Sequence, residues 1–274
     1  MSVLSPTDAS PTTSIRPGFS SGINWIGLWT LYLKEVRRFT NVYTQTLAAP
    51  VGSALLFLAV FALALGGDRK VEGVSYAVFL VPGLTIMTMV QNAFANTSSS
   101  IMIGKIQGSI VDVLMPPLSA AELTLGYALA GVTRGIVIGF AVGGVLYLFV
   151  PFTIDNWGLV VFHGVMGSML LALFGIIGAL WSVKFDHIAA VTNFVVTPLS
   201  FLSGTFYSID RLPEVPRAIA RYNPLFYMID GFRSGFIGGH DDLMWLGVVV
   251  VIATNIALFA LTWRLFAIGY KLKA

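Results

Sequence analysis

One arginine of this sequence lies deep inside a long apolar stretch, where a charged side chain needs compensation. Arg134 follows Ala120, near which the stretch begins, by fourteen residues, or about 21 Å along a helix. If the stretch crosses a bilayer, a charge at that depth costs about 2.5 to 3.5 kcal/mol on insertion scales. No acidic residue lies in the middle of any apolar stretch. Two roles stay open for Arg134: a structural one, with hydrogen bonds to neighbouring polar groups, and contact with an anionic substrate.

Other residues in apolar stretches could line a path together with Arg134. The preceding stretch contains amide side chains, two of which, at positions 92 and 96, share one helical face. A later stretch contains a proline, which at membrane depth frees a carbonyl and permits a bend. The candidate translocation path consists of Gln91, Asn92, Asn96, Arg134 and Pro198.

No set of residues points to catalysis or to a metal. His163, His187 and His240 lie in three different regions, cysteine is missing from the sequence, and neither H-E-x-x-H nor G-x-S-x-G occurs. The pair Gly104-Lys105 lacks the upstream glycine of a phosphate-binding P-loop. We therefore expect no catalytic residue, no metal and no cofactor in this chain, and no site of its own for ATP.

The composition shows what must position these residues. Of 274 residues, 56% are hydrophobic and only 11% are charged, against about a quarter in a soluble domain. This excludes a water-soluble enzyme and predicts an all-α integral membrane protein, because six stretches each approach or exceed the roughly 20 residues that cross a bilayer. The expected spans are residues 45–65, 77–97, 120–150, 157–181, 188–207 and 243–265.

The distribution of basic residues predicts how these spans are oriented. Six spans place both ends of the chain on one side, and Lys and Arg concentrate in the short connections of that side. Both termini are therefore expected in the cytoplasm, with residues 1–22 as a flexible tail and 269–274 as the cytoplasmic C-terminus. Most basic residues on the other side, Arg233 among them, fall in one long loop. A net charge of +3 does not imply nucleic acid as a partner.

Residues 23–43 are expected to form an amphipathic helix in the lipid headgroup plane. Apolar side chains recur at helical spacing, including Trp25, Trp29 and Tyr32, while Arg37 and Arg38 fall on the other side, toward anionic lipid.

Small residues recur every fourth position in two of the spans. Gly131, Gly135, Gly139 and Gly143 form such a strip in the third span, and the fourth span carries a similar one. At this spacing small side chains make a groove into which another helix packs closely. Tight packing within one subunit is the simpler interpretation, and helix movement along these faces is a further hypothesis.

Two long connections between spans and the outer end of the fifth span also have recognisable patterns. Residues 98–119 show helical apolar spacing ahead of Pro116-Pro117, which must end any helix. Residues 208–242 are too polar to span and too apolar for a free loop, so short re-entrant helices are expected there, before the last span. Phe201, Phe206 and Tyr207 crowd the outer end of the fifth span, as an interfacial aromatic belt or as an outer gate.

In combination these segments resemble the ABC-2 type exporter permeases, over about residues 24–268. The likeness is to the small inner-membrane permeases grouped with nodulation-factor, polysaccharide and drug exporters. It is carried by the six-span plan with its amphipathic first helix and by four segments. These are FLVPGL (79–84), KIQGSIVDVLMPPLSAAEL (105–123), TPLSFLSGTFYSIDRLP (197–213) and YNPLFYMIDGFR (222–233).

The resemblance implies a homodimeric permease in the bacterial inner membrane, working with two copies of a separate ABC ATPase that binds ATP and Mg. It implies a cytoplasmic coupling helix at residues 104–115 and an outer gate that includes residues 212–236. The ATPase-coupling residues would be Gly104, Lys105, Gln107, Ile110, Asp112, Met115 and Pro116. The outer gate would comprise Phe201, Phe206, Tyr207, Pro224 and Phe226.

Export of a substrate such as a glycan, lipid or drug is thus the leading function. A secondary carrier without an ATPase is the alternative, and the lack of carboxylates inside the spans counts against it. A membrane-embedded transferase would need clustered His, Asp or Glu near an interface.

Overall fold

The computed structural model describes residues 22–65, 70–208, 213, 214, 217, 220, 222–238 and 241–272. Within this part the regular elements are helices and one small hairpin, and six helical segments are long and apolar enough to cross a membrane. The predicted all-α fold with six spans is confirmed. The predicted tail, residues 1–22, lies outside the described residues except for Gly22.

The six spans lie where the apolar stretches predicted them. They are α2 (Tyr43–Leu65), α3 (Tyr76–Ile106), α5 (Ala120–Phe149), α6 (Trp157–Trp181), the segment Phe185–Thr205 and α11 (Asp241–Ala267). The second span continues well beyond its expected end at residue 97, because residues 98–106 contain no proline and the single Gly104 is tolerated within the helix. The helix stops only before Gly108, whose φ of +74° suits glycine.

The fifth span is built from short helical pieces around Pro198. They are α7 (Phe185–Val191), the π-helix η1 (Thr192–Val196), α8 (Thr197–Ser200) and the π-helix η2 (Phe201–Thr205). Proline has no N–H and its ring crowds the preceding turn, so the wider π turns on either side accommodate it. The last turn of the span, which ends at Thr205, contains Gly204 with a φ of +84°.

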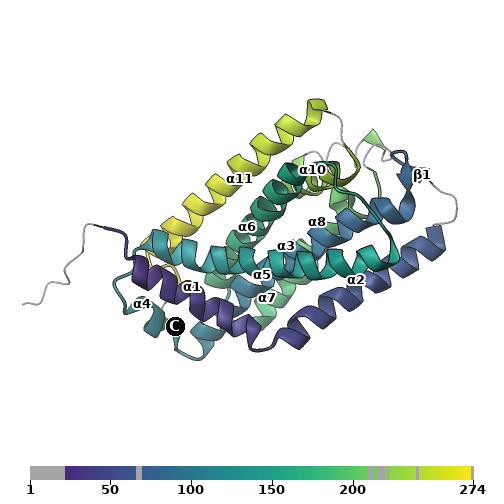
Figure 1. The fold of residues 1–274 in the computed structure, drawn as a ribbon. Helices are drawn as coiled ribbons and strands as arrows, with labels where there is room; N and C mark the ends of the chain where they lie inside the picture. Colours follow the sequence, from purple (N-terminus) through teal and green to yellow (C-terminus); the bar gives the residue numbers. More distant parts are fainter. Residues whose placement is uncertain are drawn as a thin grey trace, which may run out of the picture.

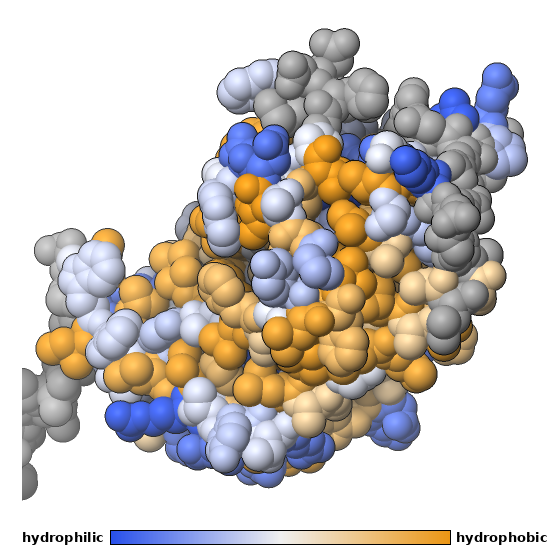
Figure 2. All heavy atoms as spheres, turned by 45° about the vertical axis from the view of Figure 1, so that its right-hand side comes forward, coloured by the Kyte–Doolittle hydropathy of each residue, from blue (hydrophilic) through white to orange (hydrophobic). Residues whose placement is uncertain are grey.

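The remaining elements gather at the two ends of the bundle. Helix α1 (Trp25–Thr40), helix α4 (Ile110–Leu114) and the end of the chain lie at one end, which we call the α4 end (Figure 1). The hairpin of β1 (Lys70–Val71) and β2 (Val74–Ser75) and helix α10 (Pro224–Ile237) lie at the other, the α10 end (Figure 1). Hydrophobic residues spread across the middle of the molecule, with hydrophilic ones toward its margins (Figure 2).

Helix α3 lies at the centre of the bundle and packs most extensively on α6 and α5. The glycine strip of α5 permits this approach. A Cβ at Gly135 would lie 2.6 Å from Ser168 Oγ on α6 and 3.0 Å from the Met89 carbonyl oxygen on α3. At Gly143 the nearest atom would be 3.8 Å away, so the strip is tightly packed over only part of its length.

Candidate functional site

Arg134 and Asn92 meet between the third and second spans. The Arg134 Nη2 donates to the Asn92 Oδ1 at 3.3 Å, and the Asn92 Nδ2 donates to the Thr88 carbonyl oxygen at 3.0 Å. The buried Arg134 Nε has no partner. The structure thus brings Arg134 to one of the amides expected near it, but no carboxylate pairs with it in the described part of the chain.

A second arginine contacts α3 one helical turn further on. The Arg38 Nη2 donates to the Asn96 backbone oxygen at 2.7 Å and to its Oδ1 at 3.0 Å, and the Arg38 Nε donates to Glu35 Oε2 at 3.1 Å. The prediction that Arg38 faces the lipid headgroups is therefore wrong. Glu35 is fully buried, and a buried carboxylate is stable only with a cation and hydrogen bonds beside it.

Both arginines line a cavity of about 780 Å³ between α1, α2, α3, α5 and the fifth span. Gln91 and Asn92 line it too, so three of the five candidate path residues lie together with Arg38. Asn96 is buried beside the cavity under Arg38, and Pro198 adjoins the lining residue Thr197. The lining residues include no acidic side chain.

Aromatic rings cluster toward the α10 end of this cavity. Phe201 stacks on Phe206 at 5.1 Å between ring centroids, and α2 contributes Phe57, 5.9 Å from Phe201, and Phe61, 4.5 Å from Phe206. We call these four residues the aromatic cluster. The sequence did not single out Phe57 and Phe61, although their spacing of four residues places them on one face of the helix.

The other expected gate residues lie elsewhere. Tyr207 follows the cluster and donates its hydroxyl to the Leu202 carbonyl oxygen at 2.8 Å. Pro224 is the first residue of α10, and Phe226 packs on Tyr227 at 5.1 Å in a different core. In the described part of the region expected to hold short re-entrant helices, α10 begins at Pro224 and ends at Ile237.

Arg233 is buried, although the sequence predicts that it lies in an outer loop. Its Nη2 donates to the Gly204 carbonyl oxygen at 2.6 Å, and its guanidinium lies 3.9 Å from the ring centre of Phe79. Burial lowers the pKa of this guanidinium, while nearby Glu72 and Asp230 oppose the shift. Gly83 permits the contact, since a Cβ there would lie 2.5 Å from the Thr205 carbonyl oxygen.

Arg233 therefore joins three of the segments that carry the family resemblance. Phe79 and Gly83 belong to FLVPGL, Gly204 to TPLSFLSGTFY and Arg233 to YNPLFYMIDGFR. A buried arginine with carbonyl acceptors and an aromatic ring fixes the relative positions of the segments it bridges.

Comparison with known proteins gives the family. A model described as ABC-2 type transporter matches residues 27–237. The chain belongs to the ABC-2 type transporter family. It is 35% identical to the inner membrane transport permease YadH of Escherichia coli (strain K12), over 91% of this chain and 98% of YadH. It is 24% identical to nodulation protein J of Rhizobium leguminosarum bv. viciae, over 80% of this chain and 84% of that protein.

In this ABC-2 chain the segment expected to contact an ATPase is not one continuous helix, and only some of its predicted coupling residues are exposed. Gly104 and Lys105 end α3, a turn follows at residues 107–109, and helix α4 has only five residues. Gln107, Asp112, Met115 and Pro116 are exposed, Met115 by 74%. Ile110 is buried and packs on Gly104, so it supports the segment from within and does not face a partner.

Lys105 also points inward. Its Nζ donates to the carbonyl oxygens of Ala179 at 3.0 Å, Leu180 at 3.0 Å and Ser182 at 2.6 Å, at the C-terminal end of α6. These carbonyls lack partners within their own helix, and a lysine there complements the negative end of the helix dipole. Lys105 thus ties the end of α3 to the end of α6.

Helix α1 is fastened to the start of α5. The Asn24 N–H donates to Oε1 of Glu122. The other carboxylate oxygen of Glu122, Oε2, accepts from the Ser119 N–H at 2.6 Å in a capping box. Further along, the hydroxyls of Tyr32 and Thr133 lie 2.9 Å apart. Trp25 and Trp29 are exposed by 67% and 59%, and Arg37 is exposed, as an interface helix requires.

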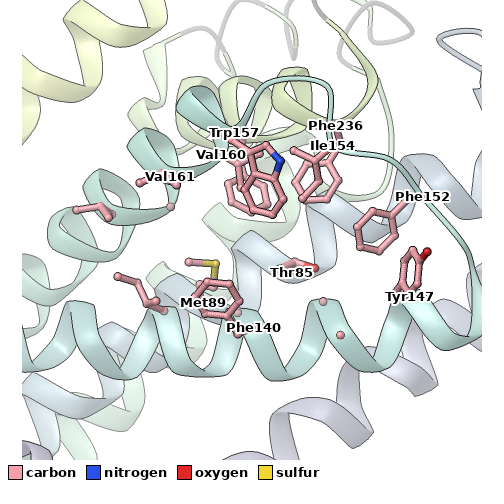
Figure 3. Close-up of a pocket in the computed structure, with 17 residues that line it drawn as sticks. Thr85, Met89, Phe140, Tyr147, Phe152, Ile154, Trp157, Val160, Val161 and Phe236 are labelled. Atoms are coloured by element: carbon pink, nitrogen blue, oxygen red, sulfur yellow. The ribbon is translucent and has the colours of Figure 1, made fainter.

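A second cavity lies on the other side of α5. It measures about 560 Å³ and is walled by α5, α6, α3 and α10, with Phe140, Trp157 and Phe236 among its aromatic residues (Figure 3). None of its lining residues is charged. An apolar hollow between two membrane spans suits hydrocarbon, whereas the first cavity combines charge, amides and apolar walls.

Proposed function

We propose that the chain is the transmembrane permease subunit of an exporter in the bacterial inner membrane, driven by a separate ABC ATPase. Two copies of the chain would pair and bind two ATPase subunits, which hold ATP and Mg. The family match and the named permease YadH support this assignment. The substrate class is expected to be a glycan, a lipid or a drug.

The observation that carries the proposal is the surface of the α4 end. Ile106, Val111 and Met115 are 53%, 54% and 74% exposed on the segment that links α3 to α5. With both termini in the cytoplasm, as the basic residues predict, these apolar side chains face water in the isolated chain. Apolar side chains gathered on one exposed segment mark a protein interface, and an ATPase there would cover them.

Hydrogen bonds and packing contacts beneath this surface would transmit movement of the ATPase to the spans. Lys105 joins the segment to α6, Ile110 packs it on α3, and Glu122 joins the start of α5 to α1. A push on the α4 end would therefore move α1, α3, α5 and α6 together relative to α2 and the fifth span. The cavity, which α1, α3 and α5 enclose with α2 and the fifth span, would then change shape. The aromatic cluster would act as the outer gate. The fifth span would bend at the π turns on either side of Pro198 when the gate opens.

The experiment is to purify the tagged chain from native membranes in mild detergent and to determine the bound proteins by native mass spectrometry. We expect a complex of two permeases and two copies of a protein with a Walker motif. Met115→Asp should release the ATPase, while Lys184→Gln, an exposed change at another position, should retain it. Recovery of the wild-type chain without an ATPase, together with ion-driven transport in liposomes, would support a secondary carrier instead.

A further inference from the structure

We propose that the cavity at Arg134 binds the anionic group of an amphiphile, a phosphate or carboxylate attached to an apolar chain. This inference rests on the proposed function, in which the cavity is part of the transport path. It names the chemical class that the path accepts.

The first argument is the balance of charge. Arg134 and Arg38 line the cavity, and the lining residues include no Asp or Glu. Glu35, behind the cavity, pairs with Arg38 at 3.1 Å and lies 4.0 Å from Lys34. Arg38 and Lys34 thus occupy the one carboxylate found near the cavity, and Arg134, the second arginine of the lining, has no ionic partner among the described residues.

The second argument is that the protein compensates the half-buried Arg134 less fully than the buried Arg233. Arg233 has two carbonyl acceptors and the ring of Phe79, and it lies outside the cavity. Arg134 has one neutral acceptor, Asn92 Oδ1 at 3.3 Å, and no aromatic ring is found against its guanidinium in the described part of the chain, while the Nε is unpaired in both arginines. A guanidinium presents five N–H donors in a fork that matches phosphate and carboxylate, so most of the binding capacity of Arg134 is unused.

The third argument concerns the rest of the wall. Phe39, Val42, Ala49, Phe57 and Met87 line the same cavity. An inorganic anion would leave these apolar surfaces unused, whereas an amphiphile places its charge at Arg134 and its chain along them. The cavity volume of about 780 Å³ is within the range of pockets for organic ligands.

The test measures binding to the purified chain in nanodiscs of phosphatidylcholine, without nucleotide or ATPase. Dodecyl phosphate is the probe, and dodecylphosphocholine, with the same chain but no net charge, is its matched control. We expect dodecyl phosphate to bind at least about tenfold more tightly than the control. Arg134→Gln should remove this preference, and Arg134→Lys should retain most of it.

A second variant covers the case in which Arg134→Gln does not fold. Gln91→Glu, nearly isosteric, adds a carboxylate to the cavity and should also abolish the preference. Arg264→Gln, on an exposed position of α11, should leave it unchanged. Equal affinity for the two probes, or an undiminished preference in Gln91→Glu, would overturn the proposal, as would binding of inorganic phosphate as tightly as dodecyl phosphate.

The source of the amphiphile can be distinguished in the same assay. Competition by phosphatidylglycerol added to the nanodiscs would assign the site to membrane lipid, and its absence would assign the site to an exported molecule. Both results support an anionic amphiphile. Because ATP is not used, a chain that binds dodecyl phosphate but no ATPase would refute the proposed function and leave this inference intact.

Discussion

Arg134 donates a hydrogen bond to Asn92 one helical turn from the place where Arg38 donates to Asn96. The two asparagines lie on one face of α3, and each accepts a hydrogen bond from one of the two arginines. Both arginines line the cavity between α1, α2, α3, α5 and the fifth span. This arrangement links the amphipathic helix α1 to the membrane interior, since Arg38 belongs to that helix and contacts the central span. A movement of α1 at the membrane surface would thereby reach the cavity directly.

Arg233→Lys should destabilise the protein. Lysine retains the charge but cannot stack as a plane on Phe79 and donate to the Gly204 carbonyl oxygen at the same time. Loss of a buried hydrogen bond from a charged group costs about 1.5 to 3 kcal/mol, so the unfolding midpoint in detergent should fall by several degrees. Arg264→Lys is the matched control and should melt like the wild type; an identical midpoint in both variants would contradict the bridging role of Arg233.

Gly135→Ala and Gly143→Ala should differ, although both replace a glycine of the same strip. The new Cβ at position 135 would lie 3.0 Å from the Met89 carbonyl oxygen, a backbone atom of a central span that cannot move aside cheaply. Overpacking of this kind costs about 1 to 3 kcal/mol. Thermal unfolding and the yield of folded protein should be lowered in Gly135→Ala alone, and equal loss in both variants would show that α5 packs differently.

Val111→Asp and Ile110→Asp are neighbouring changes with opposite expected effects. Val111 is 54% exposed, so its aspartate should leave folding intact and uncouple ATPase stimulation from the permease. Ile110 is 5% exposed, so an aspartate there places an unpaired charge in the core and should lower the yield of folded protein. Size-exclusion profiles and ATP hydrolysis separate the two, and normal hydrolysis coupling in Val111→Asp would remove this residue from the interface.

Lys105→Gln should loosen the α4 end without abolishing the fold. The variant removes the charge beside three carbonyls at the end of α6, an effect of about 0.3 to 1 kcal/mol for an exposed helix terminus and up to about 2 kcal/mol for a partly buried one. Hydrogen exchange at residues 179–182 should therefore rise. Lys184→Gln, an exposed change nearby, should leave that exchange as it is, whereas a rise in both would indicate a general loss of charge.

The spans followed from the sequence because apolar length alone decides what can cross a bilayer. The side-chain contacts inside the bundle could not be predicted in this way. Hydropathy indicates whether a residue prefers lipid or water, but it does not indicate which residue of the protein it contacts. Lys105 and Ile110 were thus assigned to a partner surface, although α6 and Gly104 hold them. The sequence places Arg233 among the outer charges because it lies in the long loop before the last span.

A signal for Arg233 was nevertheless present. The segment FYMIDGFR places mostly aromatic and apolar residues directly before this arginine, and Arg134 likewise lies among apolar residues. The role of Arg38 had no such signal, because its position on the helix is equally consistent with lipid headgroups. Only the buried Glu35 on the adjoining turn of α1 reveals where Arg38 must point.

In the proposed function this chain has no energy source of its own, and ATP bound to a partner reshapes its cavity. The sequence has no cysteine, so a single Gln91→Cys reports on the cavity without further changes. The measurement is the rate at which a thiol reagent labels this cysteine in proteoliposomes, with and without MgATP. We predict that MgATP changes the rate at least severalfold when the ATPase is present and not at all when the permease is alone; a change with the permease alone, or none with the ATPase, would contradict the account.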